Sequence, residues 1–111
     1  MKAHQNASNL IETFVKEAME ALGMHYGVEK LPKIYEVGSQ ISENEFTIDL
    51  SIYLSAPDAN VSVKGEVTLF WSDVKKDALV MEQIGERCSS MVFSFVKDYI
   101  KRIAEKKERR V

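Results

Sequence analysis

Two runs of alternating apolar and polar residues, at 46–54 and 61–71, constrain most strongly what this chain can fold into. Successive side chains of a pleated strand point to opposite faces of the sheet, so both runs are typical of strands buried on one face. The intervening segment 55–60 contains proline, aspartate and asparagine, which favour a chain reversal. We therefore expect an antiparallel hairpin whose apolar face includes Phe46 and Trp71, and which must pack on another part of the chain.

Apolar residues at helical spacing precede the hairpin and predict a first amphipathic helix. Ser8 or Asn9 is expected to cap its N-terminus, after a frayed start at residues 1–7. Two glycines and a proline follow the apolar series, so the helix is expected to end between Leu22 and Tyr26.

A weaker alternation from Lys33 to Ile41 predicts a first strand, joined to the hairpin by a turn at residues 42–44. Three consecutive strands with short turns indicate an antiparallel meander.

A long final helix is expected to begin with Ser72 or Asp73 as its cap. Its last turns, at residues 104–111, carry no apolar stripe and are expected to form an exposed basic end. The apolar positions that recur every three or four residues are Val74, Ala78, Met81, Ile84, Cys88, Met91, Val92, Phe95, Tyr99, Ile100 and Ile103.

Length and element order together predict the fold class. A chain of 111 residues, 45% of them hydrophobic, matches one domain with one core. We expect residues 1–111 to form a single α+β domain of order αβββα, with two layers. Both helices would pack on one face of a three-stranded antiparallel sheet and leave the other face open.

Charge and cysteine content limit the classes of partner. The formal net charge is −2, yet residues 97–110 carry seven basic and three acidic side chains, or +4, which mildly indicates an anionic partner or a solvated helix end. One cysteine, Cys88, allows no internal disulfide. No secretion signal or membrane span is visible, so a cytoplasmic protein that contacts no membrane is expected.

The candidates for enzyme chemistry are few, and we expect neither a catalytic site nor a cofactor. His25 has no carboxylate or cysteine at a useful spacing, and Cys88 lies on the apolar stripe of the last helix. Glu45 and Asp49 share the polar face of a strand, where paired carboxylates could act as acid and base or bind a cation. A solvated strand face is the simpler interpretation of that pair.

Two aromatic side chains are expected on the open face of the sheet. Tyr53 and Phe70 alternate with the apolar residues of their strands, so they point away from the core. They could stack on nucleobases or form a dimer interface. Their acidic neighbours Asp49 and Glu66 favour contact with protein.

The chain has proline, tyrosine and glutamate at the entry to its first expected strand, as Pro32, Tyr35 and Glu36. Phe46 opens the second strand, and the start of the last helix carries Ser72, Lys75, Lys76, Asp77 and Ala78. From about residue 9 to residue 88 this pattern resembles a double-stranded-RNA-binding domain. Three strands followed by a long helix with a basic end are also similar, more loosely, to ribosome-hibernation factors.

The resemblance implies an αβββα fold and contact between basic side chains and RNA phosphates. Our first hypothesis is nevertheless a non-enzymatic interaction module that forms a homodimer through a strand edge, the open sheet face or the long last helix. The second is a module that binds structured RNA or the ribosome. Its candidate phosphate-contacting residues are Lys75, Lys76, Lys101, Arg102, Lys106, Lys107, Arg109 and Arg110.

Overall fold

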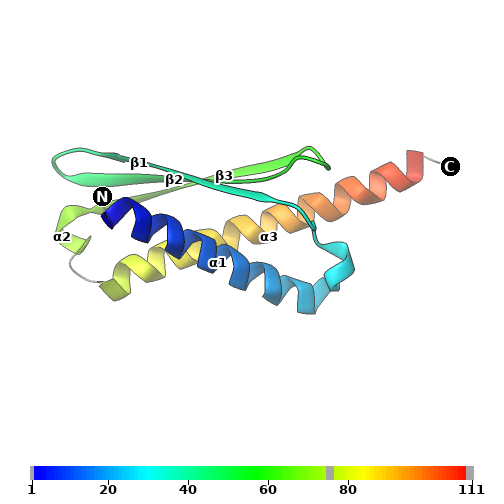
Figure 1. The fold of residues 1–111 in the computed structure, drawn as a ribbon, viewed down its shortest axis with the longest axis horizontal. Helices are drawn as coiled ribbons and strands as arrows, with labels where there is room; N and C mark the ends of the chain where they lie inside the picture. Colours follow the sequence, from blue (N-terminus) through cyan, green and yellow to red (C-terminus); the bar gives the residue numbers. More distant parts are fainter. Residues whose placement is uncertain (1, 75–76, 110–111) are drawn as a thin grey trace.

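The computed structural model describes the backbone of residues 2–74 and 77–109 and the side chains of residues 8–72 and 79–106. Both long helices lie on one side of a three-stranded antiparallel sheet (Figure 1), which confirms the predicted α+β architecture and its αβββα order. The elements are α1 (Lys2–Tyr26), the 3-10 helix η1 (Val28–Lys30), β1 (Glu36–Glu43), β2 (Thr47–Ala56), β3 (Val61–Phe70), α2 (Trp71–Val74) and α3 (Asp77–Arg109).

The first helix begins earlier than its sequence signals indicate. α1 begins at Lys2, so Ser8 lies inside the helix and the predicted cap there is wrong. The Ser8 hydroxyl is instead 3.1 Å from the hydroxyl of Ser39 on β1, and this hydrogen bond joins the helix to the sheet. The predicted end is confirmed at Tyr26, because Gly27 adopts a φ of 99°, a left-handed conformation that glycine tolerates best.

The first strand is displaced along the chain from its predicted range. β1 spans Glu36–Glu43 rather than 33–41, and the turn into β2 is formed by residues 44–46. The Asn44 Oδ1 atom accepts hydrogen bonds from the backbone N–H groups of Phe46 at 2.8 Å and Thr47 at 2.9 Å. The Asn44 side chain therefore closes the turn that ends β1.

The hairpin of β2 and β3 is confirmed, and its register aligns the two apolar faces. Leu50 is paired with Val67 and Leu54 with Val63, on the face that the helices cover. Asn60 closes the turn with a φ of 55°. Phe46 and Trp71 were predicted on this face, but they are 73% and 40% exposed because both lie just outside the strands.

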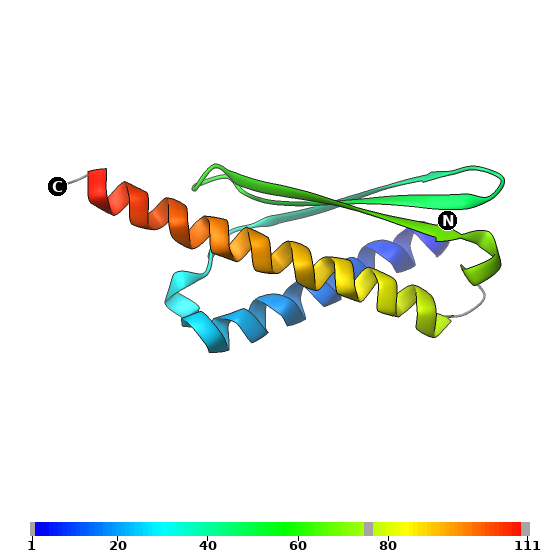
Figure 2. The same cartoon turned by 180° about the vertical axis from the view of Figure 1, so that it is seen from behind.

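The two long helices cover the sheet unequally. α3 runs along β3 and also contacts β2, whereas α1 packs mainly against α3 and only lightly against β1 (Figures 1 and 2). Accordingly, no residue of β1 is fully buried, while β2 and β3 supply much of the core. The largest fully buried side chains are Phe95, Ile11, Ile52, Leu54, Val15, Val92, Val96 and Cys88.

From residue 79 to residue 106, where its side chains are described, the long helix at the end of the chain follows its predicted stripe with two differences. The side chains of Val74 and Ala78 lie outside the described residues. Met81 was predicted inside but is 48% exposed, and Val96, which the stripe omitted, is fully buried. Ala104 and Lys106 are exposed, as expected for the helix end. Ser72 and Asp73 lie inside a separate short helix, α2, and α3 begins at Asp77, so the predicted cap of the long helix is wrong. Within the described residues, no helix is long and apolar enough to cross a membrane.

Candidate interaction surfaces

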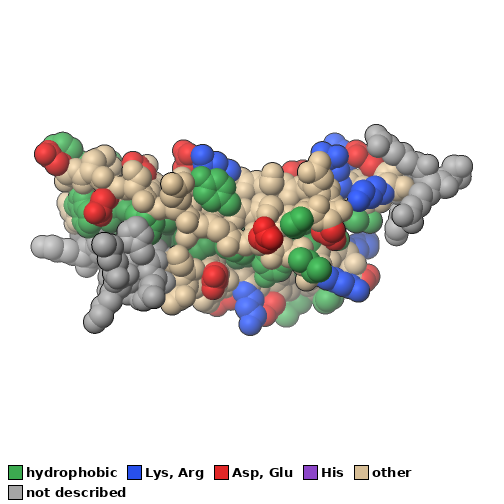
Figure 3. Space-filling model, turned by 45° about the horizontal axis from the view of Figure 1, so that its top comes forward, with side chains coloured by type: hydrophobic (Ala, Val, Ile, Leu, Met, Phe, Trp, Pro, Cys, Tyr) green, Lys and Arg blue, Asp and Glu red, His purple; other side chains and the backbone are tan. Residues whose placement is uncertain are grey.

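The open face of the sheet carries the two aromatic residues that the sequence placed there. Tyr53 is 39% exposed and Phe70 is 54% exposed. They do not form one patch, because Phe70 is paired with Thr47 and Tyr53 with Lys64, six residues further back along β3. At about 3.3 Å per residue, these two positions on β3 are roughly 20 Å apart. Figure 3 shows this face as mostly polar, with separate apolar areas.

Charged and polar contacts connect the side chains around Tyr53. The Lys64 Nζ atom lies 5.6 Å from the centre of the Tyr53 ring and 3.2 Å from a carboxylate oxygen of Glu66. The hydrogen bond to Glu66, together with the nearby Tyr53, raises the pKa of Lys64. The open face therefore presents a positive and a negative group side by side at the middle of β3.

Three exposed aromatic residues, Phe46, Phe70 and Trp71, lie at the end of the sheet where β1 turns into β2. The Trp71 backbone N–H donates to the Phe46 carbonyl oxygen at 3.0 Å, and the Trp71 indole Nε1–H donates to the Asn44 carbonyl oxygen at 2.8 Å. These bonds fix Phe46 and Trp71 at the same end of the sheet as Phe70. Sequence alternation did not predict this grouping, because it assigned Phe46 and Trp71 to the face that packs on the core.

The junction between α1 and β1 exposes a further apolar area. Met24 is 89% exposed and Val28 76%, and both line a shallow hollow together with Leu31 and Pro32. Ile34, just before β1, is 68% exposed. The sequence offered one signal, since Met24 does not fit the apolar spacing of α1.

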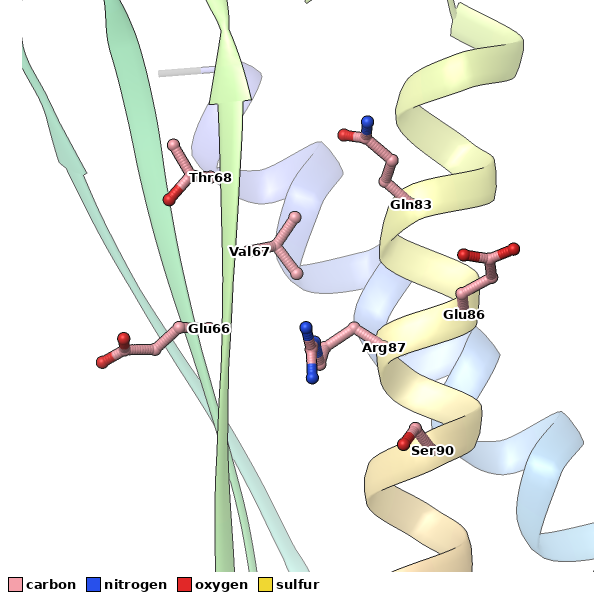
Figure 4. A pocket seen from close by; sticks show the side chains of 7 residues that line it. All are labelled: Glu66, Val67, Thr68, Gln83, Glu86, Arg87 and Ser90. Atoms are coloured by element: carbon pink, nitrogen blue, oxygen red, sulfur yellow. The ribbon is translucent and has the colours of Figure 1, made fainter.

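A cleft lies between β3 and α3, at the edge of β3 that is turned away from β2. Its volume is about 440 Å³. In Figure 4, Arg87 and Gln83 of α3 point toward β3, whereas Glu66 and Thr68 point to the other side of the strand. Gly65 makes close packing possible here, because a Cβ atom at this position would lie 3.2 Å from Arg87 Cδ and 2.9 Å from Met91 Cγ.

The basic residues predicted to contact phosphate are only partly described. Lys101 and Arg102 are exposed beside a cleft of about 540 Å³, which Asp98 and Glu105 also line. The Lys106 Nζ atom donates to the backbone carbonyl oxygen of Asp58 at 3.2 Å. Outside the described residues lie Lys75, Lys76 and Arg110, together with the side chains of Lys107 and Arg109.

The structure separates the residues considered for catalysis. Glu45 lies in the turn before β2, so the prediction that it shares the polar face of that strand with Asp49 is wrong. His25 is exposed and its ring packs edge-on against Tyr26, with the ring centres 4.6 Å apart. Asp49 accepts a hydrogen bond from Thr68 Oγ1 at 3.0 Å. The end of α1, which carries His25, lies far along the long axis from the β1–β2 turn, which is close to Asp49 (Figures 1 and 2).

Cys88 is fully buried, and this burial raises the pKa of its thiol to about 11. A thiol with such a pKa is almost entirely protonated near neutral pH and is a poor nucleophile. Among the described residues, no three histidine, cysteine, aspartate or glutamate side chains lie together as metal ligands would.

Comparison with protein-family models, curated proteins and solved structures finds no match for this chain.

Proposed function

We propose that this chain is a small non-enzymatic interaction module that associates with a second copy of itself to form a homodimer. The observation that carries the proposal is the three-stranded sheet, in which ten-residue β3 is paired with β2 and, among the residues that the structure describes, has no strand on its other side. Unpaired strand edges are surfaces that natural proteins usually cover, charge or pair with another chain. The exposed rings of Tyr53 and Phe70 on the adjoining face support an interface there, because aromatic residues are enriched in interfaces.

The first test is the molar mass in solution as a function of protein concentration. Light scattering should show a rise from the monomer mass of 12.6 kDa toward twice that value. Tyr53→Glu and Phe70→Glu are expected to weaken association, because each places a charge beside the proposed interface.

Phe93→Glu is the matched control, since Phe93 is 46% exposed but lies on α3 rather than on the sheet. It should leave the mass unchanged. A chain that stays monomeric at every concentration would contradict the proposal.

A module that binds structured RNA or the ribosome is the second candidate. The supporting observation is that Lys101 and Arg102 are both exposed at the C-terminal end of α3. Binding carried by these residues should weaken steeply as salt is raised, because phosphate contacts release counterions. Fluorescence anisotropy with a short RNA duplex measures this dependence.

The double variant K101E/R102E is expected to lose the binding, and K30E/K33E, which reverses two exposed lysines near the end of α1, should retain it. If the two double variants bind RNA equally well, Lys101 and Arg102 do not carry the contact.

A further inference from the structure

The free edge of β3 is open to a second strand. α3 runs beside it, and the cleft between them is lined on the α3 side by Arg87 and by the short side chain of Ser90 (Figure 4). A strand that approaches this edge meets flexible or short side chains of α3. Backbone N–H and C=O groups along an unpaired edge can each accept a partner strand without any change in the fold.

Symmetry limits how two copies of β3 can pair. When a twofold axis relates two antiparallel strands of one sheet, each residue points to the same face of the sheet in both copies. The axis must then pass beside one residue that lies opposite its own copy. In only two such registers do nine of the ten residues of β3 lie opposite a residue of β3 in the other copy. The axis lies at Gly65 when residues 61–69 overlap, and at Glu66 when residues 62–70 overlap.

Charge distinguishes these two registers. With the axis at Gly65, Lys64 of each copy lies directly opposite Glu66 of the other, and Val63 lies opposite Val67. With the axis at Glu66, the two Glu66 carboxylates face each other across the axis. Opposite charges at facing positions stabilise a strand pair, and like charges destabilise it.

We propose that β3 pairs antiparallel with β3 of a second copy about a twofold axis at Gly65, which joins the two sheets into one sheet of six strands. This inference rests on the self-association proposed above and specifies its surface and register. Lys64 and Glu66 already contact each other at 3.2 Å within one chain and are 52% and 69% exposed. Each can therefore reach its counterpart across the strand pair with little rearrangement.

The other edge of the sheet lacks this self-complementary pattern. The charged residues of β1 are Glu36 and Glu43, both acidic, so no register of β1 with itself brings opposite charges together. β1 is also shorter, at eight residues, and none of them is fully buried. The pairing is therefore assigned to β3.

Charge reversal followed by its compensation tests the register. K64E and E66K each replace two attractive contacts per dimer with two repulsive ones, and each is expected to raise the dissociation constant roughly tenfold. The double variant K64E/E66K restores opposite charges at both positions and is expected to return to within about threefold of the wild-type value. Sedimentation equilibrium measures all four proteins.

Two controls carry the same charge changes elsewhere. E36K lies on β1 and K33E lies just before it, and neither should change the dissociation constant. Circular dichroism of each variant shows whether it is folded.

Cysteine pairing gives an independent readout in a C88A background, in which the native thiol is absent. A mixture of K64C and E66C proteins should form a disulfide-linked dimer under mild oxidation, because these residues face each other. Either protein alone should cross-link more slowly, since identical positions are then diagonal neighbours about 7–8 Å apart.

The two proposals fail in different ways. A protein that never dimerises refutes the self-association itself. A dimer whose affinity ignores K64E and E66K, or whose mixed cysteine variants cross-link no faster than either alone, refutes the β3 register while self-association stands. Association with some other, unrelated chain through this edge would appear as a monomer in these measurements and would also count against the second copy as occupant.

Discussion

Gly65 is the position where a single added carbon tests the packing of α3 on the sheet. In Gly65→Ala the new Cβ would lie 2.9 Å from Met91 Cγ and closer still to the Met91 sulfur atom, at a site where Met91 is only 6% exposed. Contacts this short force a side chain or the helix to shift. Overpacking of this kind typically costs about 1–3 kcal/mol.

Part of that cost is offset, because alanine restricts the unfolded chain more than glycine does, by about 0.4–1 kcal/mol. We therefore expect Gly65→Ala to lower the free energy of unfolding by about 1–2 kcal/mol. This corresponds to roughly 4–10 °C in the midpoint of thermal unfolding for a domain of this size. Urea unfolding followed by circular dichroism measures the change.

Gly38→Ala is the matched control on the same sheet. Its Cβ would lie 3.9 Å from Tyr53 Cβ on the open face, which is an ordinary contact, so its stability should equal or slightly exceed that of the wild type. A double-mutant cycle with Met91→Ala isolates the cause, because the M91A substitution should cost less in the G65A background than in the wild type. Equal stability of Gly65→Ala and the wild type would refute the close packing of α3 at Gly65.

Three further predictions follow from the core and its connections. Because the folded pKa of Cys88 is about 11, against 9.0 for a free thiol, the unfolded state loses its proton first, so stability should fall by about 2 kcal/mol as pH rises from 9 to 11. This part of the pH dependence should be absent from Cys88→Ala in urea unfolding. Phe95→Ala removes the largest fully buried side chain and should lower the free energy of unfolding by about 3–5 kcal/mol in the same assay. An equal loss of stability in Phe93→Ala, where the side chain is exposed, would contradict the burial of Phe95 as the cause. Asn44→Ala removes the acceptor for two backbone N–H groups and should cost about 1 kcal/mol, while Asn44→Asp should retain most of the stability.

The candidate surfaces were only partly predictable from sequence. Alternation correctly placed Tyr53 and Phe70 outside, because the face of a strand residue depends only on its position relative to its neighbours. It could not show that Phe46 and Trp71 join Phe70 at one end of the sheet. That arrangement depends on the turn at residues 44–46, whose backbone carbonyl oxygens accept hydrogen bonds from Trp71, a residue distant in sequence at the start of α2.

The sequence by itself determined the periodic features of this protein: the β2–β3 hairpin, the buried stripes of the two helices and the order of the elements. These follow from the spacing of apolar residues, which is a local property. Tertiary structure alone decided which parts of each stripe are covered. Met81 is exposed and Val96 buried because coverage depends on where α1 and the sheet meet α3. Ser8 lies inside α1, where its hydroxyl contacts that of Ser39 on β1 instead of capping the helix. Tertiary structure also explains why residue 65 is a glycine. Met91, about 25 residues further along the chain on α3, occupies the space that a side chain at this position would fill.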